Sequence, residues 1–258
     1  MLQFFRKEFR IKSFGDRNLK KYFLYTLGEI MLIVISISAA WKINDWNSIR
    51  IDRINQFQIL SDLSKDFNAN IIALDSAIAL YPESTQRLKS TLNYVGLDPD
   101  LLSEQMKDTI INAEHVHTEL ITGSINTVLK SDILETITKD SLVALMSAYP
   151  AHVAVFKSHE EELEHIIMYN HRPILERYLS LSDIFSDEDP IFKAVKANGV
   201  KSDYQKLLKS LEYQNVLVDR LNMEDKLLQS ARQLKSKTKE VTEMLNREIG
   251  SHEVVLRR

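Results

Sequence analysis

Two short patterns pair a glutamate with a histidine three residues later, the spacing that helical di-metal proteins use. Glu162 precedes His165 in the stretch HEEELEH, and Glu114 precedes His117 in EHVH. In ferritin-like proteins two such pairs each place a carboxylate and an imidazole on one helical face, and two further glutamates complete the site. Here one pair stands at the expected end of a helix, and HEEELEH is charged enough to form a solvated face. The ferritin-like di-metal protein is therefore the weakest alternative, and we expect no metal ligand.

Other catalytic patterns are missing from the sequence. It contains no G-x-S-x-G, P-loop, H-E-x-x-H or glycine-rich dinucleotide motif, and no cysteine. No motif indicates a serine nucleophile or a phosphate-binding loop, and the absence of cysteine excludes thiolate metal sites. We expect a protein that is not an enzyme, with no catalytic residue, no cofactor-binding residue and no cofactor.

The charge distribution is uneven along the 258 residues. Residues 1–21 carry seven Lys or Arg against two acids, whereas the whole chain has a net charge of −3. This basic head stands directly before an apolar run, where it favours a topogenic signal and contact with anionic lipid head groups. Nucleic-acid binding would need a folded basic face with aromatic residues placed to stack, so we expect no nucleic-acid partner.

The apolar run covers residues 22–41 and contains a single formal charge, Glu29. Twenty helical residues extend about 30 Å, the thickness of the hydrocarbon core of a bilayer. Aromatic residues flank the run where membrane interfaces favour them, and we take Tyr22, Trp41 and Trp46 as interface anchors. The run predicts a transmembrane helix.

The expected topology is a basic cytoplasmic head at 1–21, a transmembrane helix at 22–43 and an extracytoplasmic domain at 44–258. The bias of Lys and Arg places the N-terminus inside, and the body then lies in the periplasm of a bacterial inner membrane. A cleaved signal peptide is an alternative, because the uninterrupted apolar core, 30–41, is short and contains a small-residue stretch at 38–40. A buried helix of a soluble protein is a second alternative.

A polar seam runs along the expected transmembrane helix. At 100° per residue, Tyr25, Glu29, Ser36 and Ala40 fall on one side, opposite Ile, Leu, Val and Met. The small residues Ser36 and Ala40 permit close approach of a second helix. Glu29 could snorkel to the inner interface, meet another protein helix, or belong to a proton path. We predict that it faces another helix or the inner interface.

The N-terminal region resembles a known family. FFRK at 4–7 and YFLYTLGEIMLIVISISAAWKINDWN at 22–47 are similar to the start of small membrane-anchored bacterial proteins, found chiefly in Bacteroidota and without an assigned function. The matching positions are Tyr22, Leu24, Tyr25, Gly28, Glu29, Ile30, Ile43, Asn44, Trp46 and Asn47. A looser match covers 122–149, and Ser36 and Ser38 depart from the family pattern. The resemblance implies an all-helical body tethered to the inner membrane and implies no activity.

After the apolar run, a heptad pattern predicts a long amphipathic helix. Its seam consists of Phe57, Leu60, Phe67, Ile71, Leu74, Ile78 and Tyr81, and Ser64 interrupts it. Pro82 is expected to end or bend this helix. The seam predicts the core of an intramolecular bundle, with a parallel coiled coil between two protomers as the alternative.

Shorter helices are expected in the middle of the body and a long one at its end. Asp98–Pro99 should start a helix to about Glu114, and Ser124 should cap the next. A helix over 141–180 should bend near its two prolines, Pro150 and Pro173, and an irregular acidic loop should follow at about 181–199. The last helix, 201–249, should place Tyr204, Leu208, Leu211, Val218, Leu221 and Leu228 on one side. No strand pattern is found, so the predicted fold class is all-α.

These features predict a membrane-anchored helical protein that acts through protein–protein contacts, as a structural or accessory component of an inner-membrane assembly. Its expected partners are membrane lipids and either a protein partner or a second copy, bound through the transmembrane and first amphipathic helices. A periplasmic ligand-sensing bundle that signals laterally through its transmembrane helix is the alternative from another class. The roughly 20 residues before the span are too few for a cytoplasmic output domain.

Overall fold

The computed structural model describes residues 19–112, 115–131, 134, 137, 139–185 and 189–256. Its α-helices are α1 Leu19–Asn93, α2 Glu104–Ile111, α3 Gly123–Leu129, α5 Asp140–His165, α6 Arg172–Tyr178, α7 Pro190–Asn198, α8 Tyr204–Lys209 and α9 Leu211–Leu256. Two 3₁₀ turns, η2 Pro99–Leu101 and η4 Leu181–Ile184, and a π-helical segment, η3 Ile166–His171, join them. No strand occurs among these residues, which confirms the predicted all-α class.

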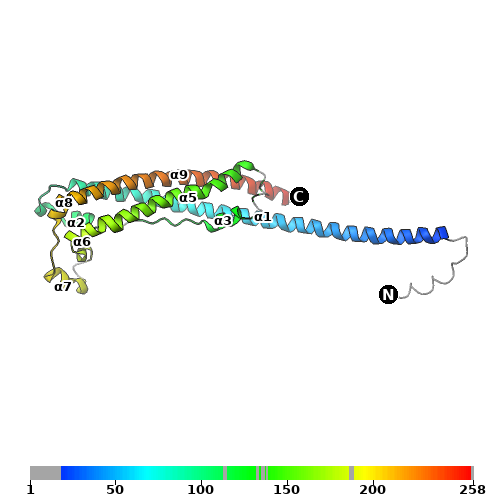
Figure 1. The fold of residues 1–258 in the computed structure, drawn as a ribbon, viewed down its shortest axis with the longest axis horizontal. Coiled ribbons are helices and arrows are strands. Elements are labelled where there is room, and N and C mark those ends of the chain that lie inside the picture. The colour runs from blue at the N-terminus through cyan, green and yellow to red at the C-terminus, as the bar shows by residue number, and fades with distance from the viewer. Residues whose placement is uncertain are drawn as a thin grey trace. The chain divides into compact units, whose positions relative to one another are not determined.

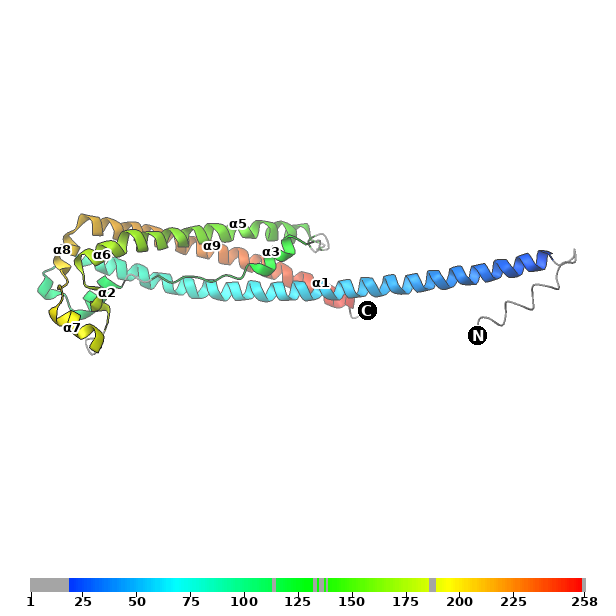
Figure 2. The ribbon, with the colours of Figure 1, turned by 60° about the horizontal axis from the view of Figure 1, so that its bottom comes forward.

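The chain divides into two compact units, residues 1–57 and residues 58–258. The first unit is described from Leu19 onward and consists of the first part of α1. The second unit contains the rest of α1 and all later helices. In it, α5 and α9 run side by side in both ribbon views (Figures 1 and 2).

The larger hydrophobic cluster of the second unit joins α1, α3, α5 and α9. The heptad seam of α1, which begins at Phe57, supplies Leu60, Phe67, Leu74 and Tyr81 to this cluster, and each is at most 4% exposed. Ser64, which interrupts the heptad, is also buried, and its Oγ donates to Asn246 Oδ1 on α9 at 2.8 Å. The seam therefore packs inside the chain, as the intramolecular bundle predicts.

A second hydrophobic cluster lies where the end of α1 meets the short helices. Leu88 of α1 packs there with Ile174 and Leu175 of α6, Leu207 of α8 and Leu217 of α9. Burial of these side chains stabilises a set of helices that are too short to be stable alone.

Proline positions in the sequence mislead about helix ends. Helix α1 continues through Pro82 to Asn93, and α5 contains Pro150 in its interior. Pro82 therefore does not end the helix, and the other alternative, that Pro82 bends it, stays a prediction. Near Pro173 the chain contains the π-helical turn η3, and Pro173 stands in the first turn of α6, which follows directly.

Helix starts in the middle of the body also differ from expectation. The helix expected from Asp98 is a 3₁₀ turn, and α2 starts only at Glu104, because the Ser103 side chain caps it by accepting from Met106 N. Ser124 caps no helix; its Oγ donates to Asp66 of α1 instead. The predicted loop at 181–199 contains η4 and α7, which Asp189 caps by accepting from Ile191 N.

The last predicted helix is split and rotated relative to expectation. A break at Ser210 separates α8 from α9, so the two segments do not share one helical phase. Leu211 and Val218 are 69% and 47% exposed, whereas the buried face of α9 includes Arg220 and Glu224. Leu211 and Val218 of the predicted apolar face are therefore wrong, because the break at Ser210 changes the helical phase, whereas Tyr204 and Leu208 are buried as predicted.

Candidate functional site

The predicted membrane anchors lie on an exposed stretch of α1. Tyr22, Trp41 and Trp46 are 56%, 68% and 72% exposed. The part of the chain that the structure describes has one helix that is long and apolar enough to cross a membrane, and the apolar window of that helix is fully exposed.

The residues of the polar seam, Tyr25, Glu29, Ser36 and Ala40, are also exposed on α1. Their spacings of four, seven and four residues within one helix place them on one side of it. The Ser36 hydroxyl donates to Leu32 O at 2.8 Å within the same helix. The neighbouring side chains of this stretch are exposed as well, so the association of the polar seam with another helix stays a prediction.

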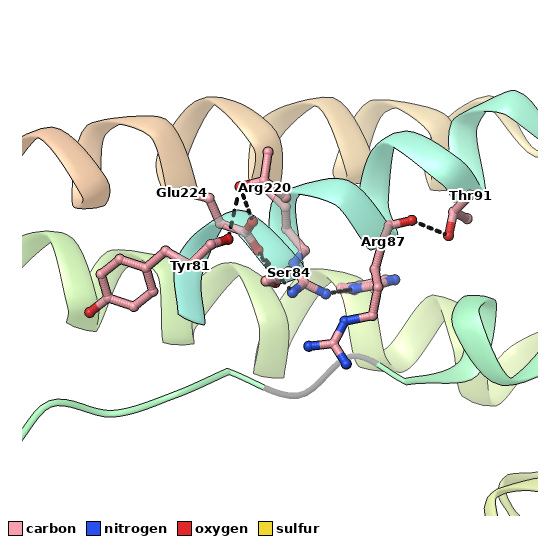
Figure 3. Close-up of polar contacts among 8 residues, drawn as sticks. Tyr81, Ser84, Arg87, Thr91, Arg220 and Glu224 are labelled. Carbon is pink, nitrogen blue, oxygen red and sulfur yellow. Dashed lines mark hydrogen bonds and ion pairs between the residues drawn. The ribbon is translucent and has the colours of Figure 1, made fainter. Parts of the chain in front are cut away.

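A polar network, which we call the polar junction, lies inside the bundle and consists of Ser84, Thr85, His171, Arg220 and Glu224. Arg220 Nη2 lies 3.2 Å from Glu224 Oε1, and both side chains are at most 3% exposed. Ser84 Oγ donates to Glu224 Oε1 at 2.8 Å, and Thr85 Oγ1 donates to Glu224 Oε2 at 3.0 Å. Figure 3 shows the carboxylate of Glu224 facing Ser84 and Arg220. Both carboxylate oxygens are thus satisfied, which offsets the cost of burying the charge.

His171 completes the polar junction from the π-helical turn. Arg220 Nη1 lies 2.7 Å from His171 Nδ1. Arginine can only donate, so Nδ1 accepts and the neutral ring carries its proton on Nε2. Burial, helped by the charge of Arg220, lowers the pKa of His171 to about 3. The same burial lowers the pKa of Arg220 from its usual value, while Glu224 opposes that change.

Three buried atoms near the polar junction have no protein hydrogen-bond partner: Arg220 Nε, His171 Nε2 and the Tyr213 hydroxyl. The Tyr213 ring lies against His171 in a tilted arrangement, with centroids 5.6 Å and planes 38° apart, and burial raises the pKa of its hydroxyl. Such unpaired groups are few in folded proteins and mark a place where polarity is retained at a cost in stability.

A second polar group forms where the extended segment 115–122 crosses α1 and α5. Thr118 N donates to Glu160 Oε1 at 2.8 Å, and Tyr81 OH lies 2.9 Å from Thr118 Oγ1. Further along, Asn70 donates to Ile121 O at 2.8 Å and accepts from Ile121 N at 2.7 Å. These bonds hold the segment in place of helical hydrogen bonds.

Of the residues paired in the two Glu–His patterns, His117 joins a group of potential metal ligands, together with two residues that the sequence did not pair, His115 and Glu160. Glu162 and His165 are exposed on α5, and Glu114 lies outside the described residues. The group that comes together is His115, His117 and Glu160, whose potential ligand atoms all lie within 4.8 Å of one another. HEEELEH is thus a solvated face at Glu162 and His165 but not at Glu160, which is fully buried.

A cavity of about 90 Å³ connects the two polar groups. It is lined by Leu80, Tyr81, Glu83, Ser84, Arg87, His115, Val116 and Glu224. A volume of this size holds a few water molecules, because one water occupies about 30 Å³ in the liquid. Pockets for organic ligands are larger, about 300–1,000 Å³. The arrangement can therefore hold water or a small ion, not an organic substrate.

Glu160 had a signal in the sequence. It falls at helical spacing with Val153, Phe156, Leu163 and Ile167, all of which are buried. Arg220 and Glu224 likewise fall on the buried face of α9. The residues that Arg220 and Glu224 contact are distant in sequence, so no local pattern indicates those contacts.

Comparison with family models, with curated proteins and with solved structures finds no match to this chain.

Proposed function

We propose that this protein is a single-pass membrane protein whose extramembrane helical bundle acts through protein–protein contacts. In this role it is a structural or accessory component of an inner-membrane assembly. The observation that carries the proposal is the exposed apolar stretch at 22–41, on a chain whose buried core lies elsewhere.

The exposed side chains of this stretch form an apolar surface far larger than the patches of soluble monomers. Examples are Phe23, Leu24, Leu32, Ile33, Ile35 and Ile37, each more than half exposed. Each such side chain gains about 1.5–3 kcal/mol when it leaves water. A bilayer covers the whole circumference of the helix, and its thickness matches the length of the stretch.

In this proposal the basic residues 1–21 lie in the cytoplasm and the bundle lies in the periplasm. The similarity of FFRK and YFLYTLGEI to membrane-anchored bacterial proteins supports the same placement. The cavity beside the polar junction is smaller than an organic-ligand pocket, so it does not favour the ligand-sensing alternative.

Topology reporters test the proposal directly. Fusions after residue 10 and after residue 258 should report a cytoplasmic head and a periplasmic tail, and the full chain should resist carbonate extraction from membranes. A cytoplasmic tail would contradict the orientation. Release of the full-length chain by carbonate would contradict the membrane anchor. A mature chain shorter by about forty residues would instead indicate a cleaved signal peptide.

We propose that the polar seam, Tyr25, Glu29, Ser36 and Ala40, contacts another transmembrane helix. Single cysteines at Tyr25, Glu29, Ser36 and Ala40 should crosslink in membranes, whereas cysteines at Met31 and Val34 on the opposite side of the helix should not. A product of twice the chain mass would indicate a second copy, and another mass would indicate a different protein. Equal crosslinking at all six positions would contradict the seam.

A further inference from the structure

The side chains of His115, His117 and Glu160 bring two imidazoles and one carboxylate close together. One potential ligand atom from each lies within 4.8 Å of the other two. The histidines come from the extended segment 115–122 and the glutamate from α5, so the fold brings together residues more than forty positions apart.

Two of these groups are held in place by their surroundings. The His115 ring stacks on Tyr81 with centroids 6.3 Å apart and planes 15° apart. Glu160 Oε1 accepts from Thr118 N, which ties the carboxylate to the segment that carries both histidines. His115 Nε2 is buried and has no hydrogen-bond partner in the protein. A buried nitrogen lone pair or N–H without a partner costs stability unless another group occupies the place.

Two imidazoles and one carboxylate form a donor set that transition metals prefer. Zn²⁺ is bound in many proteins by three such ligands, with a water in the fourth position. We propose that His115, His117 and Glu160 form a binding site for one divalent transition-metal ion of the Zn²⁺ class. His115 also lines the 90 Å³ cavity, through which water can reach the fourth position.

The ligand atoms must move slightly closer to hold the ion. Bonds of about 2.0–2.1 Å in a tetrahedron place ligand atoms about 3.4 Å apart. His117 is exposed and can turn toward the other two ligands without unpacking the core. Glu164, one helical turn beyond Glu160, adds a negative charge that interacts electrostatically with the His115 imidazole.

Lys157 is the natural competitor of the ion. Its ammonium lies 2.7 Å from Glu160 Oε2 and also contacts Thr118 O. The side chain is 30% exposed, so it can swing toward solvent when a cation approaches. Metal binding and the Lys157–Glu160 ion pair should therefore exclude each other.

The test uses the full-length chain, purified in mild detergent without a polyhistidine tag and treated with a chelator. Titration with Co²⁺, followed by visible absorption, should show one ion per chain with the intense bands of tetrahedral coordination, and Zn²⁺ should displace it. His117→Ala should weaken binding of both ions at least about tenfold, because even second-shell changes cost 10–100-fold. His152→Ala, at an exposed histidine of α5, should bind as the wild type does.

Two further variants sharpen the result. Glu160→Gln keeps an acceptor for Thr118 N but removes the anionic ligand, so it should also weaken binding at least about tenfold. Lys157→Gln removes the competing cation and should strengthen binding. The proposal is overturned if the wild type binds no Co²⁺, if His117→Ala binds normally, or if His152→Ala loses binding equally. Because this site lies in the bundle, the result is independent of the membrane topology.

Discussion

Arg220 and Glu224 place two opposite charges in the interior of the bundle, at most 3% exposed. Removal of a charge from water costs several kcal/mol, and the partner charge and hydroxyl donors offset that cost. Such a pair adds little net stability compared with apolar residues, yet the loss of one partner leaves an uncompensated charge. The polar junction should therefore be sensitive to single substitutions and much less sensitive to paired ones.

We expect Glu224→Gln to lower the free energy of unfolding by about 3–5 kcal/mol, because it leaves the Arg220 charge buried without an anion. Arg220→Met/Glu224→Gln should cost clearly less than the sum of the two single variants. Urea unfolding followed by circular dichroism measures both. Arg172→Met breaks the matched surface pair with Glu176 on α6, whose side chains are about half exposed, and should change stability by about 0.5 kcal/mol or less. Additive effects within the polar junction would contradict the coupling.

His171 should make the protein less stable in mild acid. Its pKa is about 3 in the folded chain against 6.5 as a free side chain, so the unfolded state binds a proton first as the pH falls. The stabilising contribution is complete above about pH 6.5 and decreases toward pH 3, by up to about 1.4 kcal/mol per pH unit.

His171→Asn tests this at the same site, because an asparagine Oδ1 can accept from Arg220 and does not titrate. Between pH 6.5 and 4 the free energy of unfolding of this variant should decrease less steeply than that of the wild type. His152→Asn, at an exposed position, should keep the wild-type slope. Identical slopes in all three proteins would show that His171 is not buried in its neutral form.

At the scale of elements, the π-helical turn η3 decides how α6 meets α9. It follows α5 directly, and its last residue, His171, is the one that contacts Arg220. A π turn contains one more residue than an α turn, so it changes the phase of the residues that follow. Ile174 and Leu175 of α6 thereby enter the second hydrophobic cluster.

We expect deletion of Tyr169, an exposed residue of η3, to convert this turn to α-helix and rotate α6 by about 100°. Ile174 and Leu175 would then leave the cluster, at a cost of at least about 2 kcal/mol. Thermal unfolding by circular dichroism should show a lower melting temperature for the deletion. Tyr169→Ala keeps the chain length and should melt close to the wild type. Equal melting of the two variants would contradict a positioning role for the turn.

At the scale of the molecule, the buried residues of both hydrophobic clusters lie between Leu60 and Leu245. The exposed apolar stretch at 22–41 contributes none of them. The second unit, 58–258, thus contains the packing that a domain needs.

A fragment of residues 58–258 should therefore be soluble without detergent, helical and monomeric, with one cooperative thermal transition. Circular dichroism and light scattering measure these properties. The full chain should aggregate without detergent because its apolar stretch stays uncovered. A fragment that dimerises strongly would instead support the coiled coil between protomers, and a fragment without a cooperative transition would show that the first unit is needed for folding.

Features that depend on one segment at a time could be predicted from the amino-acid sequence. The all-α class follows from scarce glycine and proline and from helical periodicity, and the α1 seam from its heptads. The apolar run at 22–41 is likewise recognised from its length and composition, because the free energy of transferring a side chain out of water depends on residue type rather than on neighbours.

Which polar residues are buried, and which of them contact one another, could be seen only in the folded chain. Glu160, Arg220 and Glu224 read as surface charges, although each falls on the buried side of its helix. Their partners Thr118, His171 and Ser84 come from other elements, up to 140 residues away. Such contacts depend on the rotation and register of one helix against another, which many side chains set together. Local periodicity does not determine that register. For this reason the polar junction and the His115–His117–Glu160 group could not be predicted from the sequence and were found only in the folded chain.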